Sequence, residues 1–232
     1  MSQPAIRRAS PNFDQRRLPV TMVVLHYTGM VDAEAAIARL CDPDAKVSAH
    51  YLIDEQGQVL VLVDEALRAW HAGASFWRGV TDVNSASVGI ELVNPGHDFG
   101  YRPFPIPQMA ALLRLLPEIV QRHGIAAANV VGHSDIAPTR KIDPGELFDW
   151  EQLASHGLAV PRPRAALTDP PWDDAGVAAA LARYGYAVDD LPAAIRAFQR
   201  RFRPEAVTGL ADAETRAILN QLLLDEGSEI AR

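Results

Sequence analysis

The sequence has few of the features that mark disulfide-linked, membrane-spanning or nucleic-acid-binding proteins. Cys41 is the only cysteine, so no intramolecular disulfide can form. No apolar run approaches the ~18 residues of a membrane span, and residues 1–17 lack the apolar stretch of a signal peptide. The net charge is −7, whereas a nucleic-acid-binding domain is normally basic. We therefore expect a monomer of the cytoplasm with no nucleic-acid partner and no membrane segment, or a periplasmic protein if an export segment precedes this sequence.

The length of the chain and its proline distribution predict two domains. At 232 residues it exceeds the usual domain size of about 100–150 residues. An apolar fraction of 48% with 22% charged residues is sufficient for a packed core. Residues 158–172 hold four prolines and little periodicity, which is typical of a linker. We therefore predict domains at residues 1–157 and 173–232, with a Pro-rich linker over residues 158–172.

Hydrophobic periodicity places strands and helices in the first of these domains. Apolar, β-branched runs predict strands at residues 20–25, 47–53, 58–63, 87–93 and 129–132. Amphipathic patterns predict helices at residues 33–40 and 108–123, with a short helix ending near Gly157. In the second domain, similar patterns at residues 175–184, 191–202 and 212–224 predict a small three-helix bundle, and residues 225–232 read as a frayed tail. The fold class is therefore α/β with a C-terminal helical bundle.

A polar loop at residues 131–145 holds several residues of the types that form functional sites. It follows a short strand and carries His133, Lys141 and Asp143, and its prolines oppose helix formation. A loop held at the end of a strand is a frequent position for functional residues. The alternative is a surface loop with a charged rim, in which Asp135 serves only as a cap.

Two histidines at strand ends suggest a metal site. His26 ends the first predicted strand and His133 follows the last one, while Asp143 lies ten residues further on. Two neutral imidazoles and one carboxylate are a sufficient ligand set for a catalytic zinc ion, with a fourth position left for water. The spacing itself is not diagnostic, and each histidine could equally be a packed structural residue.

Glu91 and Lys141 are candidates for the chemistry beside such a site. Glu91 stands among apolar strand residues, where a carboxylate is unexpected unless it is paired or functional. Desolvation would raise its pKa and suit it to proton transfer, although it could instead face the polar side of the strand. Lys141 could stabilise a developing oxyanion or simply be exposed. His71, in a loop rich in aromatic residues, could bind substrate or tune the site.

Six short motifs occur in order along the first predicted domain. They are Leu25-His-Tyr-Thr28, Ser48-Ala-His-Tyr51, Trp70-His-Ala-Gly73, Gly89-Ile-Glu-Leu-Val-Asn94, Gly132-His-Ser-Asp-Ile-Ala-Pro138 and Arg140-Lys-Ile-Asp-Pro-Gly145. In this order they resemble the zinc-dependent N-acetylmuramoyl-L-alanine amidases of the amidase-2 type (the AmpD and AmiD group, related to peptidoglycan recognition proteins). The resemblance covers residues ~18–157, and six ordered motifs are much more specific than any one of them.

The resemblance implies a fold, a metal and roles for individual residues. It implies a mixed central sheet flanked by helices, and one zinc ion per chain held by His26, His133 and Asp143. Glu91 is implied as the catalytic acid and base, and Lys141 as the group that stabilises the tetrahedral intermediate. Within the same motifs we predict substrate-binding roles for four residues, namely Tyr51, Trp70, His71 and Asn94.

The C-terminal region resembles three-helix peptidoglycan-binding domains. The match rests on Tyr184-Gly-Tyr186, on residues 194–202 and on residues 207–215. Phe198 and Phe202 lie at i and i+4, so they are expected first of all to be core residues. The peptidoglycan ligand is implied by the resemblance and not by this spacing.

The sequence thus predicts an enzyme that hydrolyses the amide between N-acetylmuramic acid, or its 1,6-anhydro form, and L-alanine in peptidoglycan or in muropeptides. The alternative is a non-catalytic peptidoglycan-sensing protein on the same fold, although such a protein would be expected to lack the complete ligand set. A protein that binds the cell wall only through the helical domain would leave the six motifs unexplained.

Overall fold

The computed structural model describes residues 5–164 and 167–230, and it has the predicted α/β architecture. A six-stranded sheet lies at the centre, in the order β1-β5-β4-β7-β3-β8. Its strands are β1 (Ile6–Arg7), β5 (Val59–Val61), β4 (Tyr51–Ile53), β7 (Ser87–Leu92), β3 (Met22–Tyr27) and β8 (Val130–Gly132). The pairs β4·β7, β7·β3 and β3·β8 are parallel, whereas β4·β5 is antiparallel, so the sheet is mixed as predicted.

One face of the sheet is covered by a long helix. Alternate residues of β3, Val23 and Leu25, point to this face and pack with Ile90 of β7 against α4 (Ile106–His123). Helix α4 ends at Gly124, which adopts the left-handed conformation that favours glycine at this position. The short helix α6 (Trp150–Ser155) contributes Trp150 and Leu153 to the same core.

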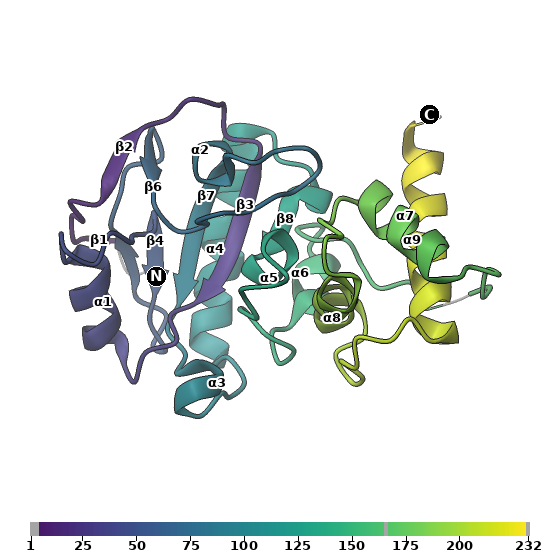
Figure 1. Cartoon of the computed structure of the whole chain (residues 1–232). Helices are drawn as coiled ribbons and strands as arrows, with labels where there is room; N and C mark the ends of the chain where they lie inside the picture. Colours follow the sequence, from purple (N-terminus) through teal and green to yellow (C-terminus); the bar gives the residue numbers. More distant parts are fainter. Residues whose placement is uncertain (1–4, 165–166, 231–232) are drawn as a thin grey trace.

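The opposite face is shared between α1 and the C-terminal helices. Helix α1 (Ala33–Cys41) is capped by Asp32 and packs on the β4–β5 side. Near β8, Met22, Val24 and Val131 form one apolar cluster with residues of α7 (Asp174–Tyr184), α8 (Leu191–Phe202) and α9 (Ala213–Ile230). Figure 1 shows α1 at one edge of the sheet, α4 behind it and α7–α9 beyond β8. Part of this face of the sheet lies between α1 and these helices.

Short elements in the loops complete the structure. A two-stranded antiparallel sheet pairs β2 (Phe13–Gln15) with β6 (Leu67–Ala69). Single helical turns form α2 (Val83–Ala86), α3 (Gly96–Phe99), η1 (Ala127–Asn129) and α5 (His133–Ile136). Within the part of the chain that the structure describes, no helix combines the length and apolarity needed to cross a membrane.

The structure corrects several local predictions. The predicted strand at residues 47–53 is reduced to Tyr51–Ile53, because Ser48 and His50 bond to loop atoms and to β7. The segment after β8 begins with a helical turn, not with a loop. Helix α9 continues to Ile230 through most of the predicted frayed tail, whose last two residues lie outside the described residues.

The predicted linker contributes to the cores at both of its ends. Leu158 and Ala159 are buried in the core beneath α4, while Leu167 and Trp172 pack against the C-terminal helices. The division into residues 1–157, 158–172 and 173–232 stays a prediction as far as independent folding is concerned. In the folded chain the central sheet and the C-terminal helices share one apolar cluster.

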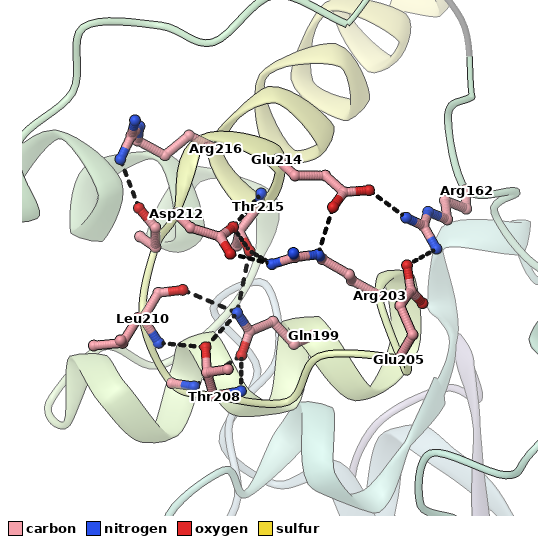
Figure 2. A network of polar contacts seen from close by, with 12 residues as sticks. Arg162, Gln199, Arg203, Glu205, Thr208, Leu210, Asp212, Glu214, Thr215 and Arg216 are labelled. Carbon is pink, nitrogen blue, oxygen red and sulfur yellow. Dashed lines mark hydrogen bonds and ion pairs between the residues drawn. The ribbon is translucent and has the colours of Figure 1, made fainter.

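A buried glutamine organises the turn between α8 and α9. Gln199 is fully buried, and its Nε2 donates to the carbonyl of Leu210 (2.9 Å) and to Oγ1 of Thr215 (3.1 Å). Its Oε1 accepts from the backbone amides of Thr208 and Gly209. Figure 2 shows this network beside the ion pairs of Arg203 with Asp212 and Glu214.

We expect Gln199→Leu to lower the free energy of unfolding by about 1–3 kcal/mol, because it removes the acceptor of the Thr208 and Gly209 backbone amides, of which the Gly209 amide is buried. Chemical denaturation monitored by circular dichroism measures the change. The control Gln221→Leu removes an exposed bond to Asp225 and should cost less than about 0.5 kcal/mol. Equal effects of the two substitutions would contradict the prediction.

Candidate functional site

Three side chains from separate segments meet on the part of the sheet face that lies between α1 and the C-terminal helices. His26 is on β3 and shares the face of Met22 and Val24, His133 begins α5, and Asp143 lies in the following loop. Nδ1 of His26 lies 2.9 Å from Nδ1 of His133 and 3.0 Å from Oδ2 of Asp143. Nδ1 of His133 lies 3.2 Å from the same oxygen. The three residues are buried, and their ligand atoms lie within 4.8 Å of one another.

A chain of hydrogen bonds defines which nitrogen of His26 carries the proton. The Ser87 hydroxyl donates to the carbonyl of Val83 (2.6 Å), so its oxygen accepts from Nε2 of His71 (3.2 Å). Nδ1 of His71 is then an acceptor for Nε2–H of His26 (3.0 Å). Burial, followed by the neighbouring His133, lowers the pKa of His26 to about 4, so this ring is neutral near pH 7. Its Nδ1 therefore presents a lone pair to the cluster.

The donor set fits a metal cation. Nε2 of His133 lies 3.2 Å from the carbonyl of Ala72, which can only accept, so in the tautomer that donates this bond Nδ1 of His133 is free to act as a ligand. Nδ1 of His26, Nδ1 of His133 and Oδ2 of Asp143 thus face one another in a buried cluster. A cation bound by all three atoms would have two nitrogen ligands and one oxygen ligand. Such a ligand set is typical of catalytic zinc.

Glu91 lies beside this cluster on β7, in register with His26 of β3. Its Oε2 is buried without a hydrogen-bond partner among the described residues. Burial, and then the negative charge of Asp143, raise the pKa of Glu91 well above its usual value, while Lys141 opposes the shift. A carboxyl group with a raised pKa holds a proton more readily than an ordinary glutamate does, which suits it to proton transfer.

These residues line a cavity of about 440 Å³ between α1 and the segment that follows β8. Of the nine residues predicted from the sequence, seven line it, namely His26, Trp70, His71, Glu91, His133, Lys141 and Asp143. The placement of these seven is compatible with the predicted roles. The assignment of the roles themselves stays a prediction.

Tyr51 and Asn94 are not among the residues that line the cavity. The Tyr51 hydroxyl donates to Glu65, which also pairs with Arg122 and His123 of α4. The Asn94 side chain bonds instead to backbone atoms of Gly96 and Arg102 and is buried. The side chains of these two residues therefore make contacts within the protein, and their substrate-binding roles stay predictions.

Sequence reasoning missed the residues that support His71. Gly89 faces the site, and a Cβ atom there would lie 2.5 Å from the His71 ring, so only glycine leaves space for this ring. Ser87, two residues earlier on the same face of β7, accepts the His71 proton. An isolated glycine inside a strand pattern marks a close approach, and this signal was present at Gly89.

Arg140 was also missed. It lines the cavity and donates to the carbonyls of Ala72 and Ala74.

The fold and this site agree with a comparison to known protein families. Residues 16–146 match the family described as N-acetylmuramoyl-L-alanine amidase, and residues 177–219 match a peptidoglycan-binding domain family. The first match covers more than half of the chain and includes all three metal-site residues. The chain belongs to the N-acetylmuramoyl-L-alanine amidase family.

Individual relatives carry the same activity in their names. The chain is 40% identical, in an alignment 237 positions long, to N-acetylmuramoyl-L-alanine amidase AmiD of Escherichia coli. This alignment covers 90% of this chain and 84% of AmiD. The chain is 34% identical, in an alignment 166 positions long, to the 1,6-anhydro-N-acetylmuramyl-L-alanine amidase AmpD of Haemophilus influenzae, covering 63% of this chain and 88% of that protein. The chain is accordingly an amidase of this type.

Solved structures show the same fold over both regions. Escherichia coli AmiD, in complex with the substrate anhydro-N-acetylmuramic acid-L-Ala-D-gamma-Glu-L-Lys, superposes with a TM-score of 0.81 over 90% of each chain at 40% identity. AmpDh3 of Pseudomonas aeruginosa superposes with a TM-score of 0.80 at 36% identity, covering 94% of this chain and 95% of that chain. The similarity therefore includes the C-terminal helices as well as the sheet.

Proposed function

We propose that this amidase is a zinc enzyme that hydrolyses the amide between the lactyl group of an N-acetylmuramic acid, in its 1,6-anhydro form, and L-alanine. The observation that supports the metal is the buried cluster in which Nδ1 of His26, Nδ1 of His133 and Oδ2 of Asp143 lie within 3.2 Å of one another. The anhydro form is supported by the names of the AmpD relatives and by the anhydro-muropeptide bound to AmiD.

Each residue at the site has a distinct task in this reaction. His26, His133 and Asp143 would hold a zinc ion, which would supply Lewis acidity toward the amide carbonyl and lower the pKa of water. Glu91 takes a proton from the attacking water and passes it to the nitrogen of L-alanine as the C–N bond breaks. The charge of Lys141 stabilises the negative oxygen that develops on the carbonyl. The products are the free lactyl carboxylate and a peptide with a free amino terminus.

The proposal is tested by product release from 1,6-anhydro-N-acetylmuramyl-tripeptide and from intact sacculi, each with and without a chelator. We expect cleavage of the small substrate that the chelator abolishes and added zinc restores. Cleavage of sacculi alone would contradict the proposed substrate and indicate wall remodelling. Zinc binding without cleavage of either substrate would favour the sensing protein.

The hydrogen-bond chain behind His26 makes Ser87 important for metal binding. Ser87→Ala removes the acceptor for Nε2–H of His71 and so loosens the tautomer that directs the Nδ1 lone pair of His26 toward the metal. Loss of such an outer partner typically weakens metal affinity about 10–100-fold. We expect a loss of about tenfold, measured by competition with a chromophoric zinc chelator.

Ser85→Ala is the matched control, because Ser85 is also buried but its hydroxyl bonds to the backbone amide of Arg17 and to Asp82, and not to His71. Its zinc affinity should equal that of the parent. An unchanged affinity in Ser87→Ala would show that this chain does not set the His26 tautomer.

A further inference from the structure

A buried polar cluster joins the C-terminal helices to the segment that carries His133. Asp135, on α5, is 1% exposed. Its Oδ2 lies 3.0 Å from Nη1 of Arg201 on α8, and its Oδ1 accepts from the Tyr186 hydroxyl at 2.7 Å. Both partners belong to the region beyond the predicted linker. Figure 1 shows α8 lying next to α5 and α6.

The cation in this cluster has little freedom to move. The Arg201 side chain is 3% exposed, and its guanidinium carbon lies 4.2 Å from the centre of the Trp150 ring on α6. The ion pair is therefore held from two sides, by a carboxylate and by an aromatic face. Surface ion pairs contribute little, but removing one partner of a buried pair leaves a desolvated charge.

The segment that Asp135 belongs to depends on such contacts for its position. Helix α5 has only four residues, and a single helical turn is not stable by itself. Oδ2 of Asp135 also accepts from the amide of Gly132, the residue directly before His133. The same carboxylate thus connects Arg201 of the C-terminal region to the backbone that places the His133 imidazole.

Apolar packing joins the same two parts. Ile136 and Ala137, which follow Asp135, are buried in one cluster with Phe198 and Phe202 of α8. The polar and apolar contacts therefore both place α5 against the C-terminal helices.

We propose that Arg201 and Tyr186 are positioning residues of the metal site, so that the C-terminal helices form part of the scaffold that holds His133. Neither residue lines the cavity, so they act through Asp135 and not by touching substrate. This inference rests on the proposed zinc site. The C-terminal region, which resembles a wall-binding domain, would then have a second role in metal binding.

The test compares two arginine variants in the full chain. Arg201→Met removes the cation that faces Asp135. Arg203→Met, at the end of the same helix, removes ion pairs to Asp212 and Glu214 that lie wholly within the C-terminal region. Tyr186→Phe is a milder second variant, because it removes one hydrogen bond to Asp135 and leaves the ion pair in place.

Three measurements are made on each folded variant: zinc affinity by chelator competition, the visible absorption spectrum after loading with Co²⁺, and kcat and KM on the anhydro-muropeptide. We expect Arg201→Met to bind zinc about 10–100-fold more weakly than the parent, with an altered Co²⁺ spectrum and a lower kcat at unchanged KM. Tyr186→Phe should show the same changes at the lower end of this range. Arg203→Met should match the parent in affinity and spectrum.

The outcomes separate this inference from the proposed function. If the parent binds zinc and Co²⁺ but Arg201→Met and Tyr186→Phe match Arg203→Met, the positioning role is wrong while the zinc site stands. A parent that binds neither ion would overturn both. If Arg201→Met does not fold, the affinity and spectrum of Tyr186→Phe decide the question.

Discussion

Glu91→Gln is expected to lower kcat about 10²–10⁴-fold on the anhydro-muropeptide, which is the usual contribution of a general acid and base. The amide side chain keeps the shape of the carboxyl group but cannot take a proton from water. Because Glu91 is not one of the three metal-site residues, the variant should retain zinc at the affinity of the parent. Turnover of purified, zinc-loaded protein measures the loss, and metal analysis verifies the loading.

The pH dependence of kcat provides a second readout for Glu91. As a base, Glu91 must be ionised, so activity falls as the pH drops through its pKa. Because burial and then Asp143 raise this pKa, the fall should begin at a higher pH than for an ordinary glutamate. The residual activity of Glu91→Gln should lack this ionisation. Glu118→Gln, at an exposed position on α4 outside the cavity, is the control and should behave as the parent. Normal turnover by Glu91→Gln would refute the mechanism.

Asp143→Asn is expected to abolish both zinc binding and hydrolysis. It replaces the one anionic ligand by a neutral amide, which is a poor ligand for zinc. In the parent, zinc at 100 times its dissociation constant stabilises the folded state by about 2.7 kcal/mol through mass action. We therefore expect zinc to raise the Tm of the parent by several degrees and to leave the Tm of Asp143→Asn unchanged, as measured by differential scanning calorimetry.

A matched control makes this prediction more specific. Asp98→Asn, at an exposed residue lining the same cavity, is the control and should keep the response to zinc. A zinc-dependent rise in the Tm of Asp143→Asn would exclude Asp143 as an essential ligand.

Much of the sheet and of the candidate site could be predicted because each depends on local patterns. The apolar run ending in His26 has the composition of a buried strand, and it is β3, which lies between β7 and β8 in the sheet. Glu91 among apolar neighbours signalled an unusual carboxylate, and the structure gives it a raised pKa and a buried oxygen that has no hydrogen-bond partner among the described residues. The family was confirmed by the match over residues 16–146.

The remaining features depend on contacts between distant segments. Strand β6 exists because it pairs with β2, and neither segment alone has a strand pattern long enough to recognise. Tyr51 belongs to a motif next to His50, yet its side chain points to Glu65, because successive side chains of a strand face opposite sides. The ion pair of Asp135 with Arg201 joins residues that the sequence separates by a proline-rich stretch. Hydrophobic patterns carry no information about such pairs.

The alternation along β3 has a consequence for synthesis of the chain on the ribosome. Val23 and Leu25 pack in a cluster with α4, which begins at residue 106, whereas Met22 and Val24 pack in a cluster that includes α7–α9, the first of which begins at residue 174. At about 5–20 residues per second, this second cluster stays incomplete for several seconds after α4 has been made. The growing protein therefore presents an apolar surface that chaperones can bind until α7–α9 have been made.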